Sequence, residues 1–527
     1  MKQTLLTICL ILFALPSWVV CDARAEVTVF DTDDSASLYG GNIPQFIKPD
    51  PNYETMKYYL LQELNDKKAF SQHSVKPSRT PLKFNTTLRS HPFLTNQMKT
   101  TGLISYLYYE DGNIVYDELS PKEVFGFIIN NDTALWSHSV GKSLVSYVLG
   151  HAICEGYIDN VEQKLNDWPL ISDTLYSNQK LIDIINMRAR DDQHVDDNKG
   201  LLKTGRWYNV HSIKSFSERE LKGTKPNFLT KYHYNGLATN IVLNYVVHKT
   251  GSDFLNLMNQ IFQKNVKVSN KVFFLKQKYP QTDESRILND RPILEDKDGI
   301  ARYSFYASRY DYLRIAKTML HDWQNDTCAG KYLKEIYQKR EWKNKNIENK
   351  NPQTGRAKAC GGQFHTDYVE MEDRKILGMN GYGRQSIMID FDKSRIVVVN
   401  SIHTNYDWYE LVHQVIKNGI INDNLKLNPT NSNFKRRNKY DRTKVGMEKR
   451  FQCLLEYAAK NSMTNLPTKQ EIASLITNLE GNDYYRSHRQ LAKSGLSQES
   501  VDANKSTLLR LVNYEGTNKD YCIQPVL

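Results

Sequence analysis

The stretch of sequence that decides the fold is WSHSVGKSLVSYVLGHAICEG, residues 136–156. Its apolar residues recur at spacings of three and four, as they do on one broad face of a helix. They are Val140, Leu144, Val145, Val148, Leu149, Ala152 and Ile153. Gly156 is a residue typical of the position just past a helix end. We therefore predict a helix over residues 139–154, and its wide apolar face indicates that it is buried in the centre of a domain.

Ser139 and Lys142 lie three residues apart at the start of this helix, so their side chains can meet across one turn. A serine hydroxyl becomes a nucleophile when a nearby base takes its proton. Burial against apolar neighbours lowers the pKa of a lysine, which leaves the amine neutral, as a base must be. The same spacing at residues 177–180 and 432–435 lacks an apolar helix after it. The spacing alone also fits a capping serine followed by a surface lysine, so the buried helix is what favours a nucleophile and its base.

The segment around Ser139 resembles the nucleophile helix of serine β-lactamase-related proteins, above all their class C-like branch. That branch includes class C β-lactamases, DD-peptidases, esterases and 6-aminohexanoate-dimer hydrolases. Residues 181–188, 231–251 and 310–316 resemble later elements of the same family in the same order. The resemblance covers residues 96–425. It implies an α/β (α+β) fold of the β-lactamase/transpeptidase type, in which helices flank an antiparallel sheet that a large helical insertion interrupts.

The resemblance also implies that a tyrosine is the second base. Tyr232 and Tyr234 are the candidates, and the interval to the Thr-Gly pair at the end of the next helix selects Tyr234. A phenolate beside a lysine ammonium is stabilised electrostatically, so Lys142 and Tyr234 can share one proton. The Asn or Ser that the family carries two residues after the tyrosine is Gly236 here, and Asn235 is the candidate to replace its side chain. The alternative is that Tyr234 is a core tyrosine of a tyrosine-rich protein.

A glycine-rich segment takes the place of the third family motif, which is typically Lys-Thr-Gly or His-x-Gly. It comprises Gly381, Tyr382, Gly383, Arg384 and Gln385. Glycine lets the backbone approach a substrate closely. Backbone N–H groups near Arg384 and Gln385, with that of Ser139, would form an oxyanion hole. The motif lysine that would recognise a β-lactam carboxylate is missing, and Tyr382 or Arg384 could replace it. The other interpretation is an ordinary glycine-containing hairpin.

Strand signals occur at both ends of the region that resembles the family. Residues 102–109 and 114–116 flank Asp111-Gly112, a strong hairpin turn, and residues 386–391 and 395–400 form a second hairpin. Helices are expected over residues 181–187, 240–249, 310–322 and 407–420. One sheet closed by distant pieces of the chain, with a helical insertion between them, accounts for this order.

The two ends of the chain lie outside the resemblance. Lys2, an apolar run and Ala23-Arg24-Ala25 indicate a signal peptide over residues 1–25, with a lipoprotein anchored at Cys21 as the alternative. Residues 26–95 predict an irregular N-terminal arm, packed on a hydrolase domain over residues 96–425. Residues 426–445 predict a basic linker, and residues 446–527 predict a C-terminal helical appendage. We therefore expect an exported protein of a bacterial periplasm.

Composition limits the partners. The chain of 527 residues has 70 Lys and Arg against 59 Asp and Glu, and its mean hydropathy is −0.59. These values exclude a polytopic membrane protein, and no run after residue 25 is long enough to span a bilayer. A basic surface is either simply solvated or suited to an anionic partner such as the cell wall. Export argues against nucleic acid as a partner.

The loop over residues 191–197 has four aspartates and His194. We predict that this loop is solvated and binds no metal, and we predict no cofactor for the protein.

Cysteine pairing is predicted from position. Cys328 and Cys360 bracket one polar stretch, and Cys453 and Cys522 bracket the C-terminal region. We pair them in this way, and Cys154 would then be a free, buried thiol. An oxidising compartment permits such disulfides.

These observations favour an exported serine hydrolase that cleaves an amide or ester bond of a small or peptide-like molecule through an acyl-enzyme on Ser139. An amidase or esterase of the 6-aminohexanoate-dimer hydrolase type is the first hypothesis. A cell-wall DD-peptidase is the second, and a β-lactamase is the third. A catalytically silent binding protein on the same fold is the alternative of a different class, because the second and third motifs depart from the family pattern.

Overall fold

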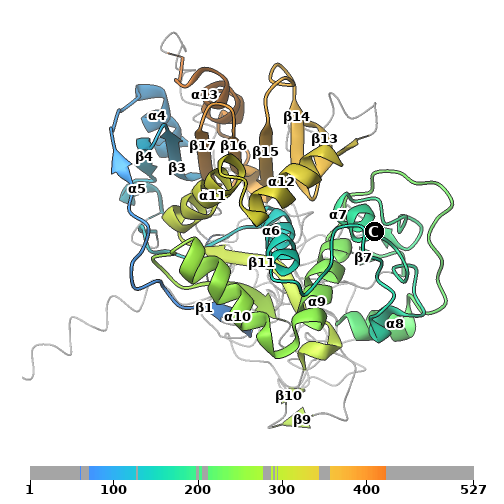
Figure 1. The fold of residues 1–527 in the computed structure, drawn as a ribbon. Coiled ribbons are helices and arrows are strands. Elements are labelled where there is room, and N and C mark those ends of the chain that lie inside the picture. Colours follow the sequence, from blue (N-terminus) through green and yellow to red (C-terminus); the bar gives the residue numbers. More distant parts are fainter. Residues whose placement is uncertain are drawn as a thin grey trace, which may run out of the picture. The chain divides into compact units, whose positions relative to one another are not determined.

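A nine-stranded sheet organises the described part of the chain, in the order β12-β13-β14-β15-β16-β17-β3-β4-β2 (Figure 1). The computed structural model describes residues 71–125, 129–196, 201–204, 212–276, 287–288, 291–292, 295–343 and 357–422, with Leu60 and Leu64. Neighbouring strands are antiparallel except for β2 and β4, which are parallel. The strands are Asn85–Thr86 (β2), Leu103–Glu110 (β3), Asn113–Leu119 (β4), Glu341–Trp342 (β12), Ala357–Gly361 (β13), Phe364–Tyr368 (β14), Ile376–Gly381 (β15), Gln385–Asp390 (β16) and Arg395–Ser401 (β17).

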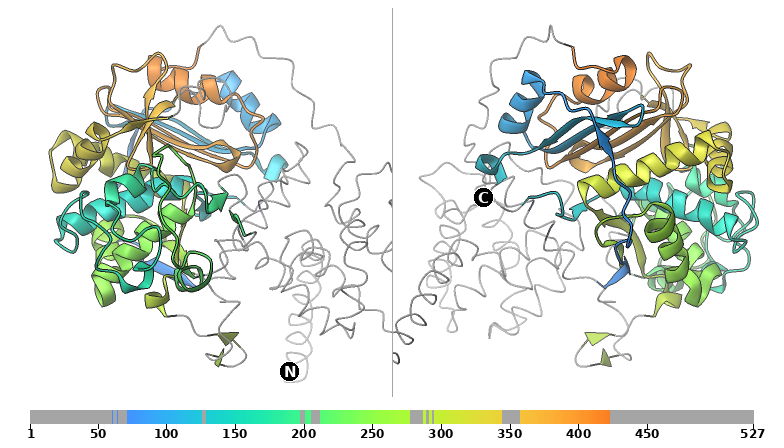
Figure 2. Two further views of the ribbon diagram at one scale, coloured as in Figure 1. Left: turned by 90° about the vertical axis from the view of Figure 1, so that its right-hand side faces the viewer. Right: turned by 60° about the vertical axis from the view of Figure 1, so that its left-hand side comes forward.

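Helices cover both faces of this sheet. On one face lie α4 (Pro92–Thr100), the π-helical turn η8 (Tyr409–Gln414) and α13 (Val415–Asn418). On the other face lie α6 (Val140–Cys154) and α11 (Arg309–Gln324), and Figure 2 shows α11 and α13 on opposite sides. The first face buries a cluster that includes Tyr106, Tyr108, Met388, Val397, Leu411 and Val412. The predicted fold class, an antiparallel sheet flanked by helices, is therefore confirmed.

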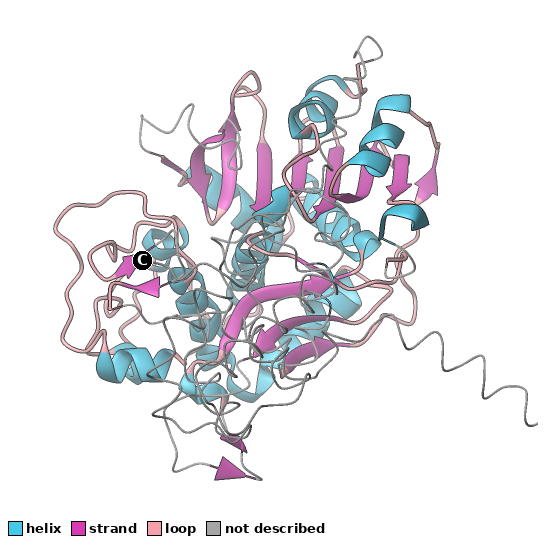
Figure 3. Cartoon of the chain, turned by 180° about the vertical axis from the view of Figure 1, so that it is seen from behind, coloured by secondary structure: helices cyan, strands magenta, loops and turns pink. Residues whose placement is uncertain are grey.

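A second, four-stranded antiparallel sheet, separate from the first, combines three strands of the insertion with β1 of the N-terminal segment (Figure 3). Its order is β1-β8-β11-β5, with the strands Gln72–Val75, Val272–Lys276, Ala301–Ala307 and Leu135–Trp136. Two short hairpins pair Val195–Asp196 (β6) with Leu201–Leu202 (β7) and Ile287–Leu288 (β9) with Arg291–Pro292 (β10). Besides α6 and α11, the described helices of the insertion are Lys122–Phe125 (α5), Leu181–Ile185 (α7), Ile213–Arg219 (α8), Leu237–Thr250 (α9), Phe254–Met258 (α10) and Cys328–Gln338 (α12). The insertion is thus mixed, whereas the sequence predicted a helical one.

Helix α6 is the central helix of the molecule, as its broad apolar face predicted. Every residue from Val140 to Ala152 is buried. The helix contacts β15 and β16 of the large sheet as well as β11, α9 and α12. A side chain at Gly141 would collide with the carbonyl of Tyr303 in β11, and one at Gly150 would collide with the ring of Tyr332 in α12. Glycine at these two positions therefore permits the close packing that buries the helix.

The expected arm, residues 26–95, is described only in part. In the described part, β1 pairs with β8, and β2 pairs with β4. The arm is therefore not wholly irregular, because its short strands add to the edges of the two sheets, where backbone pairing needs no apolar period. The predicted signal peptide, linker and helical appendage lie outside the described residues. No helix in the described part of the chain has the length and apolar character needed to cross a membrane.

The predicted cysteine pairing is wrong where it can be compared. Cys154 is bonded to Cys328 across a Cα–Cα distance of 5.7 Å, and Cys360 is the free, buried thiol. Cys154 ends α6 and Cys328 begins α12, and these two helices pack together. Helix packing therefore brings together cysteines that lie 174 residues apart. Cys453 and Cys522 lie outside the described residues.

Candidate active site

Ser139, Lys142 and Tyr234 meet at the N-terminal end of α6. The Lys142 Nζ lies 2.8 Å from the Ser139 Oγ and 3.0 Å from the Tyr234 hydroxyl. Ser139 is the N-cap residue of α6, but its side chain makes no capping hydrogen bond. Its hydroxyl is therefore directed to the lysine rather than to the helix backbone. The three side chains can exchange a proton without further movement.

The surroundings of Lys142 favour a neutral amine. The residue is 3% exposed, and its Nζ lies 4.5 Å and 4.2 Å from the ring centres of Tyr234 and Tyr303. No ion pair of Lys142 is found among the described residues. Burial lowers the pKa of Lys142 to about 7, because a charge is poorly solvated in such a place.

The proton of the pair is held by the tyrosine. Burial raises the pKa of Tyr234, and its hydrogen bond to Ser139 offsets part of that rise. The pKa of Lys142 is shifted in the opposite direction. Above about pH 7 the favoured state is thus a neutral lysine beside a neutral phenol.

The backbone just before Ser139 is held in an uncommon conformation. His138 has a φ of +46°, a region that few residues other than glycine adopt. Its ring packs on Trp136, with 4.0 Å between ring centres, and lies 5.5 Å from the ring of Tyr382. Trp136 belongs to β5, which pairs with β11. His138 is thus a packing residue, and the strained turn aims Ser139 from a firmly held strand.

A buried aspartate fixes the loop that carries Tyr234. The Asp191 carboxylate accepts hydrogen bonds from the Tyr176 hydroxyl at 2.7 Å and from the Asn235 amide at 3.0 Å. The His233 Nδ1 lies 2.7 Å from it. Asn235 uses its other atom, Oδ1, to accept the N–H of Ala238 in the first turn of α9. The side chain of Asn235 is therefore committed to the loop and the helix.

Sequence reasoning missed Asp191. The aspartate-rich loop over residues 191–197 was expected to be solvated, yet Asp191 is fully buried. Asp192, the next residue, lies 2.7 Å from Lys231 in an ion pair. Four aspartates close together in sequence give no sign of which one turns inward. Only its contacts with His233 and Asn235, which are distant in sequence, distinguish Asp191 from the other three aspartates.

The glycine-rich segment lies beside the nucleophile through its backbone. A side chain at Gly381 would come within 3.0 Å of the carbonyl of Ser137 and the Cβ of His138. The Arg384 guanidinium donates to the carbonyl of Tyr406, and the Gln385 amide donates to the carbonyl of Ser401. These two side chains hold the turn against the chain after β17. Arg384 thus uses one guanidinium nitrogen to hold the turn, and its Nε is buried with no hydrogen-bond partner among the described residues.

A second buried amine lies near the site. The Lys343 Nζ is 2.7 Å from the His365 Nδ1 and donates to the carbonyl of Ala357. Burial lowers the pKa of Lys343 to about 8. Burial, Lys343 and Lys142 together lower the pKa of His365, which is therefore neutral. Cys360 is close to Lys343 and is hydrogen-bonded to Tyr232, the candidate tyrosine that does not meet Lys142. No sequence signal marked this cluster, because its members share no motif.

The other Ser-x-x-Lys match within the described residues has a different setting. Lys180 forms a solvent-exposed ion pair with Glu162 at 2.9 Å. The match at residues 432–435 lies outside the described residues. Within the described ranges, no group of three or more His, Cys, Asp or Glu side chains is arranged to hold a metal ion.

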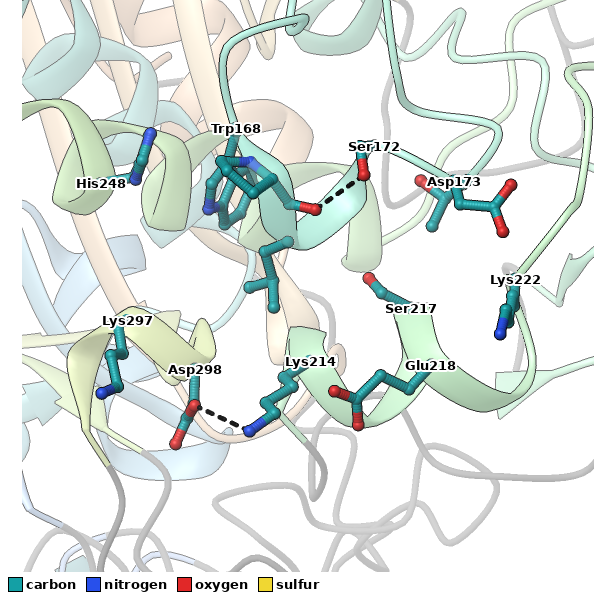
Figure 4. Close-up of a pocket in the computed structure, with 13 residues that line it drawn as sticks. Trp168, Ser172, Asp173, Lys214, Ser217, Glu218, Lys222, His248, Lys297 and Asp298 are labelled. Atoms are coloured by element: carbon teal, nitrogen blue, oxygen red, sulfur yellow. Dashed lines mark hydrogen bonds and ion pairs between the residues drawn. The ribbon is translucent and has the colours of Figure 1, made fainter.

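A pocket of about 570 Å³ opens elsewhere on the insertion. Figure 4 shows it between Trp168, the helix that carries Lys214 and Ser217, and the turn that carries Asp298. An ion pair of 3.7 Å joins Lys214 and Asp298. Ser139, Lys142 and Tyr234 do not line this pocket. It is thus distinct from the candidate active site.

No model of a known protein family matches this sequence, and no curated protein matches it. Several solved structures are similar to it. A proposed 6-aminohexanoate-dimer hydrolase from Bacillus anthracis is 15% identical over 72% of this chain and 96% of its own, with a TM-score of 0.46. A β-lactamase from Sulfitobacter sp. EE-36 is 12% identical over 62% of this chain and 94% of its own, with a TM-score of 0.43. A class C β-lactamase from Rhodobacter sphaeroides is 13% identical over 60% of this chain and 95% of its own, with a TM-score of 0.40. At such identities and scores, the role of each side chain follows from this chain's own contacts.

Proposed function

We propose that this chain is an exported serine hydrolase that cleaves an amide or ester bond through an acyl-enzyme on Ser139. The observation that carries the proposal is the position of the buried Lys142 amine, 2.8 Å from the Ser139 hydroxyl and 3.0 Å from the Tyr234 hydroxyl. A lysine so placed, with a pKa of about 7, is a base of the right strength for neutral pH. The resemblance of residues 136–156 to the nucleophile helix of β-lactamase-related proteins supports the same chemistry.

Acylation begins with neutral Lys142. Its amine takes the Ser139 proton as the Oγ forms a bond to the substrate carbonyl carbon, and the carbonyl electron pair moves onto oxygen. We assign the oxyanion to backbone N–H groups of Ser139 and of the turn over residues 382–385. The bond to the leaving group then breaks. Tyr234 passes its proton to the leaving atom and regains one from the Lys142 ammonium.

Deacylation repeats these transfers with water. Lys142 is again neutral and, through Tyr234, accepts a proton from water as the water oxygen attacks the acyl carbon. The tetrahedral species collapses, the carbon–Oγ bond breaks, and Ser139 recovers its proton from the Lys142 ammonium. Serine, lysine and tyrosine thus return to their starting states, and the sum of the steps is hydrolysis.

A small or peptide-like amide or ester is the proposed substrate class, with a 6-aminohexanoate-dimer hydrolase type of activity first. A cell-wall DD-peptidase or a β-lactamase is the alternative within the same chemistry. Both alternatives rank lower because the motif lysine that would recognise a substrate carboxylate is missing from residues 381–385. Export is supported by the Cys154–Cys328 disulfide, since such bonds persist in oxidising compartments.

A fluorophosphonate probe tests the proposal directly. We expect mass to be added to the wild-type protein at Ser139 and expect none on Ser139→Ala. Ser177→Ala is the matched control, because Ser177 begins the other Ser-x-x-Lys match in the described chain, and it should be labelled like the wild type. No labelling of the folded wild-type protein, together with no turnover of p-nitrophenyl esters or nitrocefin, would favour the silent binding protein instead.

A further inference from the structure

Two large apolar side chains stand out from the loop that leads to Tyr234. Phe228 is 92% exposed and Leu229 is 67% exposed. They are adjacent in sequence and follow Pro226 and Asn227. Folding normally removes such side chains from water, so this pair has to be held outward by its surroundings.

The base of the loop is firmly attached on both sides of the pair. The Asn227 N–H donates to the carbonyl of Arg190 at 2.8 Å, and its side-chain amide lies 3.2 Å from both Asp192 oxygens. Further along, Lys231 forms its ion pair with Asp192, and the His233 N–H donates to the carbonyl of Met187 at 2.7 Å. The polar groups at the base of the loop are thus hydrogen-bonded or ion-paired, whereas the apolar side chains at its tip are exposed to water.

The charge of the loop is of one sign. Residues 221–236 contain Lys222, Lys225 and Lys231 and no aspartate or glutamate. Lys222 and Lys225 are exposed, and neither forms an ion pair with another described residue, although Lys222 lines the same pocket as Asp173 and Glu218 (Figure 4). An apolar tip among lysines is the arrangement that binds the interface of an anionic bilayer, because the rings and alkyl groups enter the headgroup region while the ammonium groups meet lipid phosphates.

A second exposed aromatic side chain lies on a strand that is joined to the base of the loop by an ion pair. Trp342 in β12 is 65% exposed. Its neighbour Glu341 forms an ion pair of 2.5 Å with Arg188, which belongs to the segment that holds the base of the loop. Tryptophan is enriched at membrane interfaces. Three of the six most exposed large apolar side chains among the described residues therefore belong to one contact network around the Tyr234 loop.

We propose that Phe228 and Leu229, with Lys222, Lys225 and Trp342, form a docking surface for an anionic lipid bilayer. The occupant is a lipid surface rather than a protein groove, because the tip projects outward and its lysines complement lipid phosphates. Docking through this loop would attach to the membrane the segment that carries Tyr234, which lies five residues after Leu229. The enzyme would then act on substrates held at or near that surface. This inference goes beyond the proposed hydrolysis and does not require it.

Vesicle binding by the full chain tests the proposal. We expect the wild type to co-sediment with phosphatidylglycerol vesicles more strongly than with phosphatidylcholine vesicles, and salt should weaken the binding. Phe228→Ser with Leu229→Ser should lower the partition coefficient about ten-fold or more. Lys222→Gln with Lys225→Gln should reduce the preference for phosphatidylglycerol. Leu255→Ser is the matched control, because Leu255 is 47% exposed on α10, and it should bind like the wild type.

The outcomes separate this proposal from the enzymatic one. Ser139→Ala should bind vesicles like the wild type, so a failure of catalysis leaves the binding result unaffected. Thermal unfolding of each variant shows whether the exposed substitutions leave the fold intact. The proposal is overturned if the wild type binds neither vesicle or if the Phe228→Ser, Leu229→Ser variant binds as well as the wild type. It is equally overturned if that variant instead changes proteolysis of residues 423–527, since that chain segment would then be what covers the loop.

Discussion

At the scale of the residue, Lys142 is a base that burial makes possible. Its amine is far from solvent and has tyrosine rings rather than a carboxylate beside it. A carboxylate would hold the proton on the lysine and raise its pKa. The proposed chemistry therefore depends on two features of the described structure. No carboxylate of the described residues pairs with this amine, and two hydroxyl groups, those of Ser139 and Tyr234, contact it.

The pH dependence of hydrolysis should report this amine. Lys142 has to be neutral to take the Ser139 proton, and its pKa is about 7, so kcat/KM should rise with pH through about 7 and then level off. Tyr234→Phe should lower kcat/KM by about 10²–10⁴-fold while leaving the position of the rise unchanged. The measurement is p-nitrophenyl ester hydrolysis from about pH 5 to about pH 9. A profile that falls through neutrality would contradict a neutral lysine base.

Removing the buried amine should stabilise the protein. The pKa of Lys142 is lower in the folded state, about 7, than its ordinary value of 10.5. The unfolded chain then binds the extra proton between these values, so this group makes stability rise with pH across that window, and its cost is greatest below about pH 7. We expect Lys142→Met to raise the free energy of unfolding by about 1–3 kcal/mol near pH 6, with a smaller gain near pH 9.

Urea unfolding at the two pH values measures this gain. The control is Lys180→Met, which removes an exposed lysine and should change stability by less than about 0.5 kcal/mol. A Lys142→Met variant that is less stable than the wild type at both pH values would show that the amine contributes more through its hydrogen bonds than it costs by its burial.

At the scale of the element, periodic segments were predictable and long-range pairings were not. Helix α6 was predicted to within one residue at its start, because a broad apolar face and a following glycine are local signals. The hairpin of β16 and β17 was predicted for the same reason. Strand β8, with the sequence Val-Phe-Phe-Leu-Lys, is a short apolar run that fits a strand or a helix equally well. Only pairing with β1 and β11, distant in sequence, makes it a strand.

The candidate site divides in the same way. Ser139 and Lys142 share one helical turn, so their meeting is a local property that the sequence could predict. Tyr234 needed the family resemblance, because nothing nearby distinguishes it from Tyr232. Asp191 and Lys343 had no signal at all, since their partners come from other elements. Buried polar networks of this kind are set by packing rather than by spacing along the chain.

The Tyr234 loop should depend on Asp191. Asp191→Asn keeps the shape of the side chain but turns one acceptor into a donor, so the bonds with Tyr176 and Asn235 cannot all persist. We expect kcat to fall about 10–100-fold with little change in KM, because the proton relay is displaced while the substrate cleft remains. The control is Asp192→Asn, whose carboxylate contacts Lys231 and Asn227 but not Tyr176 or Asn235, and whose loss should leave kcat nearly unchanged. Equal falls in both variants would mean that the loop is merely destabilised and that Asp191 has no positioning role.

The disulfide should stabilise the packing of α6 on α12. It joins residues 174 apart. In the chain-entropy account, closing a loop of that length raises the free energy of the unfolded chain by about 5 kcal/mol. Cys154→Ala with Cys328→Ala should therefore lower the thermal midpoint clearly, and a reducing agent should do the same to the wild type. Peptide mapping without reduction should recover the Cys154–Cys328 pair. Recovery of a Cys328–Cys360 peptide pair would contradict the Cys154–Cys328 bond and support the pairing expected from sequence position.

At the scale of the whole molecule, the site is assembled from pieces that the large sheet brings together. Strand β3 near the start of the described chain pairs with β17 near its end. The insertion between them supplies α6 and the Tyr234 loop, and β15 supplies the glycine-rich turn. Closure of the sheet is thus what places the turn over residues 382–385 against the residues before Ser139.

The compact unit over residues 42–436 contains every side chain that the proposed chemistry uses. We therefore expect a fragment of these residues to unfold in one cooperative transition and to hydrolyse a soluble ester with a kcat/KM within about three-fold of that of the longer chain. Ester hydrolysis and urea unfolding measure the two expectations, and Ser139→Ala in the fragment supplies the inactive control. If the fragment folds but loses ten-fold or more in kcat/KM, residues outside 42–436 contribute to catalysis. If only the vesicle binding of the fragment changes, those residues act on the surface around Phe228 and leave the chemistry to α6, the Tyr234 loop and β15.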